Sequence, residues 1–324
     1  SHDIKSNDTM IRMLQGDVGS GKTIVALISM LTSISDGSQS VLLVPTEILA
    51  MQHYNTIKEL TKHLDLEIIL LLGESKATES KKERSEIIKK ISEGSIKIII
   101  GTHALISKKI IYKNLSLAVI DEQHRFGVKQ RVEITDKGDN VNVLVMTATP
   151  IPRSLALTAY GDMDISTITE KPKGRKEIKT YVMPQNKINE VIVSINRAIE
   201  NDALVYWVCP LIEESENLDL IAVNERFEFL KNRFKDYNIS LVHGKQNKID
   251  RENSINDFKQ GKSKILVATT VIEVGVDIPD ATIMVIECAE RFGLAQIHQL
   301  RGRVGRSEKE SSCILLYKSE LTPV

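Results

Sequence analysis

The sequence predicts an α/β protein with two tandem domains, each a mainly parallel sheet with helices on both faces. Short, continuous apolar runs alternate with longer amphipathic stretches along the whole chain. Continuous runs, unlike alternating ones, are typical of parallel strands buried on both faces. The pattern then restarts after a polar segment near the middle, and 324 residues are enough for two domains.

The predicted elements follow in order along the chain. The expected strands of the first half are residues 41–44, 67–72, 96–100, 117–120 and 143–146, with helix-like stretches at 46–63 and 78–93. Those of the second half are 204–208, 239–242, 264–267, 282–286 and 312–317. Residues 169–180 are polar, contain Pro172 and Gly174, and read as a linker between domains 1–168 and 181–324. Ligands of such sheets bind beyond the carboxyl ends of the strands, so the residues that follow the apolar runs are the candidates for a site.

Composition narrows the class of protein. Lys+Arg and Asp+Glu both number 43, so a nucleic-acid partner would be met by local patches and not by a globally basic field. Aromatic residues are only 4% of the chain, which argues against extensive base stacking. No apolar run approaches the roughly 20 residues of a membrane span. Three separated cysteines, Cys209, Cys288 and Cys313, predict free thiols in a reducing compartment, the cytoplasm.

A glycine-rich segment fits the pattern of a phosphate-binding loop, GxxxxGK[ST]. It follows the apolar segment 10–14 and precedes the helix-like stretch 24–33, which is the context that the pattern requires. Backbone N–H groups and the helix start would bind phosphate oxygens, Lys22 would reach the β- and γ-phosphates, and the Thr23 hydroxyl would bind Mg²⁺. The predicted nucleotide-binding residues are Gly16, Asp17, Val18, Gly19, Ser20, Gly21, Lys22 and Thr23. The alternative is a glycine-rich turn between a strand and a helix.

Two acidic residues end the expected strand at 117–120. Asp121 is the predicted Mg²⁺ ligand, and Glu122 is the predicted residue that orients and deprotonates the attacking water. Neighbouring side chains on a strand point opposite ways, so the two carboxylates can take separate roles. A solvated acidic turn is the alternative, and a small-molecule kinase could also use a phosphate loop with this acidic pair.

The second half carries a cluster of arginines. Gln299, Arg303 and Arg306 lie at i, i+4 and i+7 of a helix-like stretch that begins near Leu294, which would place them on one helix face. A guanidinium suits a transferring phosphoryl group, so these residues would complete the site when the domains close, coupling hydrolysis to domain motion. The alternative is an ordinary solvated basic face.

Taken in order, the segments GDVGSGKT, VLLVPTEILAMQ, IIIGTHALI, VIDEQHRFGVKQR, MTATPIPRSLAL, VHGK, VATTVIEVGVDIPDA and QLRGRVGR resemble the motor of superfamily 2 helicases. The residues within these motifs are similar to those of the RecG family of bacterial ATP-dependent DNA helicases. The resemblance covers nearly the whole chain and implies two RecA-like domains, with ATP and Mg²⁺ as cofactors. Transcription-repair coupling factors share much of this motor, but Ser20 and Gln123 favour RecG.

The resemblance also implies roles for residues that spacing alone does not assign. Gly275 and Asp277 would lie near the nucleotide, and His124, Thr147 and Thr149 would couple the nucleotide site to DNA. The residues that would line the DNA track are Thr46, Gln52, Thr102, His103, His243, Gly244, Thr269 and Thr270. Small hydroxyl and backbone groups after strands suit phosphate oxygens. The residues alone equally permit Thr46 as a helix N-cap, Thr102 and Thr270 as turn residues, and the two histidines as structural.

The expected function is therefore an ATP-dependent DNA helicase or translocase motor acting on branched or forked DNA, as a monomer. The family's wedge domain, its adenine-contacting glutamine and its C-terminal helical hairpin are expected to lie outside these residues, which suggests a fragment with weaker ATP affinity and poorer coupling. A nucleotide-dependent DNA-binding switch and the motor of a coupling factor, with RNA polymerase as partner, are the alternatives.

Overall fold

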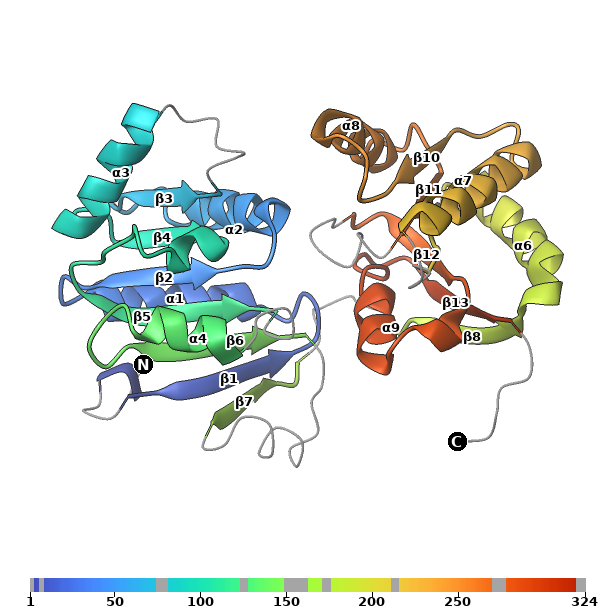
Figure 1. The fold of residues 1–324 in the computed structure, drawn as a ribbon. Helices are drawn as coiled ribbons and strands as arrows, with labels where there is room; N and C mark the ends of the chain where they lie inside the picture. The colour runs from blue at the N-terminus through green and yellow to red at the C-terminus, as the bar shows by residue number, and fades with distance from the viewer. Residues whose placement is uncertain are drawn as a thin grey trace. The chain divides into compact units, whose positions relative to one another are not determined.

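The fold is that of a computed structural model of the chain (Figure 1). The structure describes residues 3–5, 9–73, 81–122, 128–148, 163–170, 176–210, 216–269 and 278–318. The chain divides into two compact units, residues 1–170 and 171–324. Each unit is built around one sheet, and neighbouring strands within the described residues of each sheet run parallel.

Within its described residues, the first unit holds a seven-stranded sheet with the order β3-β4-β2-β5-β6-β1-β7. Its strands are β1 (Ile11–Gly16), β2 (Gln39–Leu43), β3 (Ile68–Leu71), β4 (Ile98–Gly101), β5 (Leu115–Asp121), β6 (Asn142–Thr147) and β7 (Asp164–Ile168). Its helices are η1 (Asp3–Lys5), α1 (Lys22–Ile34), α2 (Glu47–Leu60), α3 (Lys81–Glu93), η2 (His103–Ile106) and α4 (Val128–Thr135). Strands β2, β4, β5 and β6 are buried along nearly their whole length, as continuous apolar runs predict.

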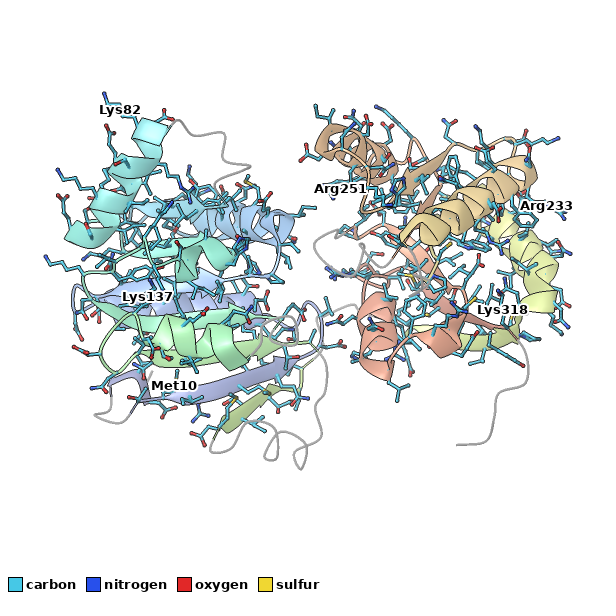
Figure 2. The ribbon with its side chains drawn as sticks, in the orientation of Figure 1. Met10, Lys82, Lys137, Arg233, Arg251 and Lys318 are labelled. Carbon is cyan, nitrogen blue, oxygen red and sulfur yellow. The ribbon has the colours of Figure 1, made fainter. Side chains whose placement is uncertain are left out.

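Helices cover both faces of this sheet (Figure 1). On one face, α1 and α2 contribute Met30 and Ile57 to a core that includes Leu42 and Val119. On the other, α3 and α4 contribute Ile91 and Ile134 to a second core. The turn after α4 is tied to the segment between η2 and β5 by Lys137, labelled in Figure 2, whose Nζ donates to the carbonyls of Ser107 and Ile110 at 2.7 and 2.8 Å.

The described part of the second unit holds a six-stranded sheet with the order β10-β11-β9-β12-β13-β8. Its strands are β8 (Lys179–Pro184), β9 (Leu204–Val208), β10 (Ile239–Val242), β11 (Ile265–Ala268), β12 (Ala281–Ile286) and β13 (Ser312–Tyr317). Its helices are η4 (Gln185–Lys187), α6 (Ile188–Glu200), α7 (Glu216–Arg233), α8 (Lys248–Lys259), η6 (Ala289–Arg291) and α9 (Leu294–Arg301). Helices α6 and α7 cover one face, with Ile195 and Leu230, and α8 and α9 cover the other, with Phe258 and Leu300.

The predicted architecture of two α/β domains with helices on both faces is confirmed, but two strands were not foreseen. Strand β7 and strand β8 lie at the edges of their sheets, and both are largely solvent-accessible. Neither therefore has the continuous apolar run of a buried strand. Lys179 and Thr180, which the sequence assigned to a linker, are the first two residues of β8. Among the helices in the described ranges, none is long and apolar enough to cross a membrane.

Candidate functional site

The predicted phosphate loop lies between the carboxyl end of β1 and the start of α1. Strand β1 ends at Gly16, and α1 begins at Lys22 with Gly21 as its N-cap. The loop closes on itself, because the Ser20 amide donates to the Asp17 carbonyl at 3.1 Å. The Lys22 ammonium donates to the carbonyls of Gly16 and Asp17 at 2.7 and 2.8 Å. The lysine therefore lies across its own loop, where phosphate oxygens could replace these two acceptors.

The backbone of this loop requires glycine at two positions, Gly21 and Gly16, for different reasons. Gly21 has φ +94°, a conformation that residues with a Cβ seldom adopt. Gly16 has no room for a Cβ, which would lie 2.5 Å from the Ser20 hydroxyl and 3.2 Å from the Ile168 side chain. The first turn of a helix has backbone N–H groups without intrahelical partners, and the helix dipole makes this end favourable for anions. The start of α1 thus has the backbone chemistry of an anion site.

The acidic pair lies at the carboxyl end of β5. Asp121 is 8% exposed, and both of its carboxylate oxygens have hydrogen-bond partners within the chain. Oδ1 accepts from the Glu122 amide at 3.0 Å, and Oδ2 lies 2.9 Å from Nε2 of His53 on α2. Glu122 follows in a left-handed backbone conformation, with φ +53°. Non-glycine residues in this conformation concentrate at functional sites, because the surrounding structure must hold them there.

The sheet order and register bring these segments to one edge of the first unit. Strand β6 lies between β5 and β1, with Asp121 opposite Met146 and Gln15 opposite Thr147. The ends of the three strands are therefore level. The buried Thr147, the acidic pair and the phosphate loop all lie at or directly after the carboxyl ends of adjacent parallel strands, which is where such sheets bind ligands.

The residues at this edge fit a Mg²⁺ ion with few protein ligands. Mg²⁺ takes oxygen ligands, and protein sites for it commonly use one or two carboxylates together with substrate phosphates and water. Asp121 supplies a buried carboxylate, and Thr23 supplies a hydroxyl in the first turn of α1. No group of three or more His, Cys, Asp or Glu side chains suited to a metal occurs in the part of the chain that the structure describes. One buried carboxylate and one hydroxyl suit an ion that is bound largely through nucleotide phosphates and water.

The predicted DNA-contact residues of the first unit follow the neighbouring strands of the same edge. Thr46, after β2, is the N-cap of α2, and its hydroxyl accepts from the Leu49 amide at 3.4 Å, so the N-cap alternative describes it here. Thr102, after β4, is 2% exposed, and its hydroxyl has no hydrogen-bond partner among the described residues. Gln52 and His103 are exposed. The candidate DNA residues thus lie on the segments that follow β2 and β4, whereas the candidate nucleotide residues lie at the ends of β5, β6 and β1.

The second unit shows the same division along its sheet. His243 and Gly244 follow β10, and Thr269 follows the adjacent β11. The His243 amide donates to Oε1 of Gln246 at 3.2 Å, and burial, together with Lys245, lowers the pKa of the His243 imidazole. Thr269 is 3% exposed and its hydroxyl has no partner in the described ranges. Gln299 lies instead on α9, after β12.

The prediction that Gln299, Arg303 and Arg306 lie on one helix face is wrong. Helix α9 ends at Arg301, with Gly302 as its C-cap, so Arg303 and Arg306 lie beyond the helix. Gly305 follows with φ +69°, a backbone conformation that ends regular helix. The Arg306 Nε donates back to the Gly302 carbonyl at 3.2 Å. Only Gln299, which is 5% exposed, lies on the helix itself.

The predicted site residues that lie outside the described residues are His124, Thr149, Thr270, Gly275 and Asp277. The sequence did not predict the role of His53 beside Asp121, nor the buried carboxylate of Glu287 after β12. The sequence did hold a signal for His53, because this histidine directly follows Gln52, a predicted site residue on the same helix. A carboxylate directly after a buried strand was the signal for Glu287, and it is the same signal that identified Asp121.

Two family models match the chain. The model for DEAD/DEAH box helicases matches residues 2–158, and the model for the helicase conserved C-terminal domain matches residues 185–308. The chain therefore belongs to the helicases that combine these two domains.

Among these helicases the chain is similar to RecG proteins over nearly its whole length. It is 46% identical to the ATP-dependent DNA helicase RecG of Thermotoga maritima over 316 residues, which cover 97% of this chain and 40% of that protein. It is 46% identical to RecG of Escherichia coli K12 over 318 residues, which cover 97% of this chain and 45% of that protein. The chain thus spans less than half the length of these relatives.

Solved structures agree with this placement. A structure of RecG bound to a three-way DNA junction matches with a TM-score of 0.78 and 42% identity, over 98% of this chain and 41% of that one. Saccharomyces cerevisiae Dbp5 bound to RNA and ADP BeF3 matches with a TM-score of 0.70 over 96% of this chain and 80% of that one. At 18% identity, the second match shows the fold alone.

Proposed function

We propose that this chain is the ATP-hydrolysing motor of a DNA helicase that acts on branched DNA. The observation that carries the proposal is the phosphate loop after β1 at the same sheet edge as the Asp121–Glu122 pair after β5. The 46% identity to RecG helicases, together with the match to a RecG structure bound to a three-way DNA junction, supports the substrate.

In the nucleotide site, the chain's own groups would bind and orient the triphosphate. Lys22 would exchange its two carbonyl acceptors for phosphate oxygens, and the N–H groups at the start of α1 would bind the same anion. Thr23 and Asp121 would hold Mg²⁺, which when bound neutralises charge developing on the phosphates. Glu122 would orient the attacking water and accept its proton.

In the second unit, Gln299, Arg303 and Arg306 would complete the site in the ATP-bound state. Guanidinium groups suit the charge that spreads over a transferring phosphoryl group. Because Arg303 and Arg306 lie beyond α9, their reach would depend on the segment around Gly302 and Gly305 and not on a rigid helix face.

The DNA would follow the other half of each sheet edge. The candidate residues after β2 and β4, and those after β10 and β11, would present hydroxyl and backbone groups to phosphate oxygens. Such contacts carry no sequence information, which agrees with recognition of a branch by its shape. Because the chain has no net charge, DNA binding would rest on local basic patches with few phosphate contacts, and few contacts predict only a shallow fall of affinity as salt is added.

ATP hydrolysis with and without a three-way DNA junction tests the proposal. We expect the junction to raise the rate, and Glu122→Gln to lower kcat by about 10²–10⁴-fold while ATP still binds, because the amide cannot accept the proton. Glu86→Gln, the same charge change on an exposed residue of α3, is the matched control and should hydrolyse ATP normally. If the unsubstituted chain binds ATP but turns it over no faster than Glu122→Gln, the binding-switch alternative replaces the motor.

A further inference from the structure

The carboxylate proposed to hold the metal ion has a partner on a different element, His53 of α2. Nε2 of His53 lies 2.9 Å from Oδ2 of Asp121, across 68 residues of sequence. Both residues are 8% exposed, so the pair is shielded from bulk water. A carboxylate that binds a metal ion can only accept hydrogen bonds, so in that role Asp121 would accept a hydrogen bond from Nε2 of His53. The hydrogen bond leaves each Asp121 oxygen with lone pairs for another ligand.

Helix α2 places His53 on its buried face. Ala50, His53 and Ile57 are the buried residues of this helix, and their spacing of three and four residues puts them on one side. Ala50 and Ile57 pack into the apolar core beneath the helix, whereas His53 puts a polar group on that side. The residue before it, Gln52, is exposed, and the helix begins at the N-cap Thr46. One helix thus carries two candidate DNA residues and the partner of the candidate metal ligand.

The contact fixes the direction of the Asp121 side chain. Oδ1 is held by the Glu122 amide and Oδ2 by His53, so rotation of the carboxylate would break both hydrogen bonds. A ligand held in this way needs no reorganisation when the ion arrives. Hydrogen bonds from outer residues to ligating carboxylates commonly change metal affinity by about 10–100-fold.

We propose that His53 is a positioning residue that orients Asp121 for the metal ion and links α2 to the nucleotide site. The inference rests on the proposed function, because it assigns Asp121 to the metal. A shift of α2 when DNA binds would move the donor at Oδ2, so the metal site would respond to DNA through this one contact. A histidine that serves packing alone would stabilise the unit but leave metal affinity unchanged.

Two amide substitutions separate these roles. Gln carries its amide nitrogen three bonds from Cβ, as His carries Nε2, so His53→Gln retains a donor toward Oδ2. Asn carries its nitrogen one bond closer, in the place of Nδ1, so His53→Asn has the same chemical group but cannot reach Oδ2. Ile57→Val, on the same buried helix face, is the control for a general loss of packing and should lower the melting temperature slightly without changing metal affinity.

The measurement is binding of Mn²⁺, as a paramagnetic probe for the Mg²⁺ site, in the presence of ADP, followed by electron paramagnetic resonance. We expect His53→Asn to raise the dissociation constant of Mn²⁺ about 10–100-fold, with His53→Gln and Ile57→Val close to the unsubstituted chain. Melting temperatures of all variants show whether each is folded. Junction DNA should change Mn²⁺ affinity in the unsubstituted chain and in His53→Gln, but not in His53→Asn.

The outcomes are distinct. A folded His53→Asn variant that binds Mn²⁺ and ADP as tightly as the unsubstituted chain refutes the role of His53 and leaves the proposed function standing. An unsubstituted chain that shows no metal-dependent binding of ADP refutes the proposed function and this inference with it. Equal loss of Mn²⁺ affinity in His53→Gln and His53→Asn refutes the role of the Nε2 donor.

Discussion

Replacing Glu287 with Gln changes a buried charge at the end of β12 in the second unit. Oε1 of Glu287 accepts from Nε1 of Trp207 and lies 2.6 Å from Nε of Arg226 on α7. Oε2 accepts from Nε2 of Gln185 at 3.3 Å. The Glu287 side chain is 6% exposed and the Arg226 side chain 23%, so the carboxylate is held almost entirely by protein groups. It joins η4, β9, α7 and β12 in one cluster.

The expected loss of stability follows from these contacts. The amide of Glu287→Gln keeps an oxygen for Trp207 but removes the charge opposite Arg226, and its NH₂ group faces another donor on Gln185. Breaking a buried ion pair costs about 3–5 kcal/mol, because the remaining charge is left uncompensated. Arg226 is partly exposed, so water would screen part of that loss. We therefore expect the second unit to lose about 2–3 kcal/mol of unfolding free energy.

Denaturant unfolding followed by tryptophan fluorescence measures this loss. Trp207 is the only tryptophan of the sequence and lies in the second unit, so its signal reports that unit selectively. We expect a lower midpoint with an unchanged slope. A double-mutant cycle with Arg226→Met should give a coupling energy of about 1–3 kcal/mol. If Glu287→Gln unfolds within about 0.5 kcal/mol of the unsubstituted chain and the cycle shows no coupling, the ion pair does not stabilise the unit.

Two further predictions concern the phosphate loop and the thiols. Gly21 has φ +94°, and a Cβ added there would have no atom within 4 Å, so Gly21→Ala should cost about 1–2 kcal/mol of backbone strain alone and weaken ADP binding at least about tenfold. Titration with a fluorescent ADP would show this, and unchanged affinity would contradict it. Burial raises the pKa of the Cys313 thiol to about 12, and the thiolate is the nucleophile, so a thiol reagent at about pH 8 should not modify Cys313 in the folded chain. Mass spectrometry after labelling would locate the modified cysteines, and rapid labelling of folded Cys313 would be the contrary result.

Local sequence predicted the strands that are buried on both faces. Residues 204–208 form a fully buried strand with those bounds, because a continuous apolar run needs cover on both faces of the sheet. Residues 239–242 and 312–317 also form strands with the predicted bounds, although each is partly exposed. The phosphate loop could also be predicted from local sequence, because one short segment contains the end of the strand, the glycines and the start of the helix. The edge strands β7 and β8 were missed because half-exposed strands carry mixed residues that resemble a loop.

Contacts between distant segments could not be predicted in this way. The partner of Asp121 is 68 residues away, and that of Trp207 is 80 residues away, so each depends on how strands and helices are arranged in space. The early end of α9 was also missed, but here the cause lies in the local sequence. The spacing of Gln299, Arg303 and Arg306 suits a helix, whereas Gly302 and Gly305 interrupt it. Two glycines so close together weaken a helix enough to outweigh a favourable spacing of side chains.

The order of strands in space differs from their order of synthesis. Strand β1 lies between β6 and β7, so the strand that precedes the phosphate loop has no neighbour in its sheet until Thr147 has been made, 131 residues after Gly16. At synthesis rates of about 5–20 residues per second, this interval is roughly 7–26 s. Among the described residues, strand β8 likewise pairs only with β13, the last strand of its sheet. In each unit the first strand of the sheet therefore pairs with strands that are made last, so a ribosome that stalls midway would leave that first strand unpaired and exposed to chaperones and aggregation.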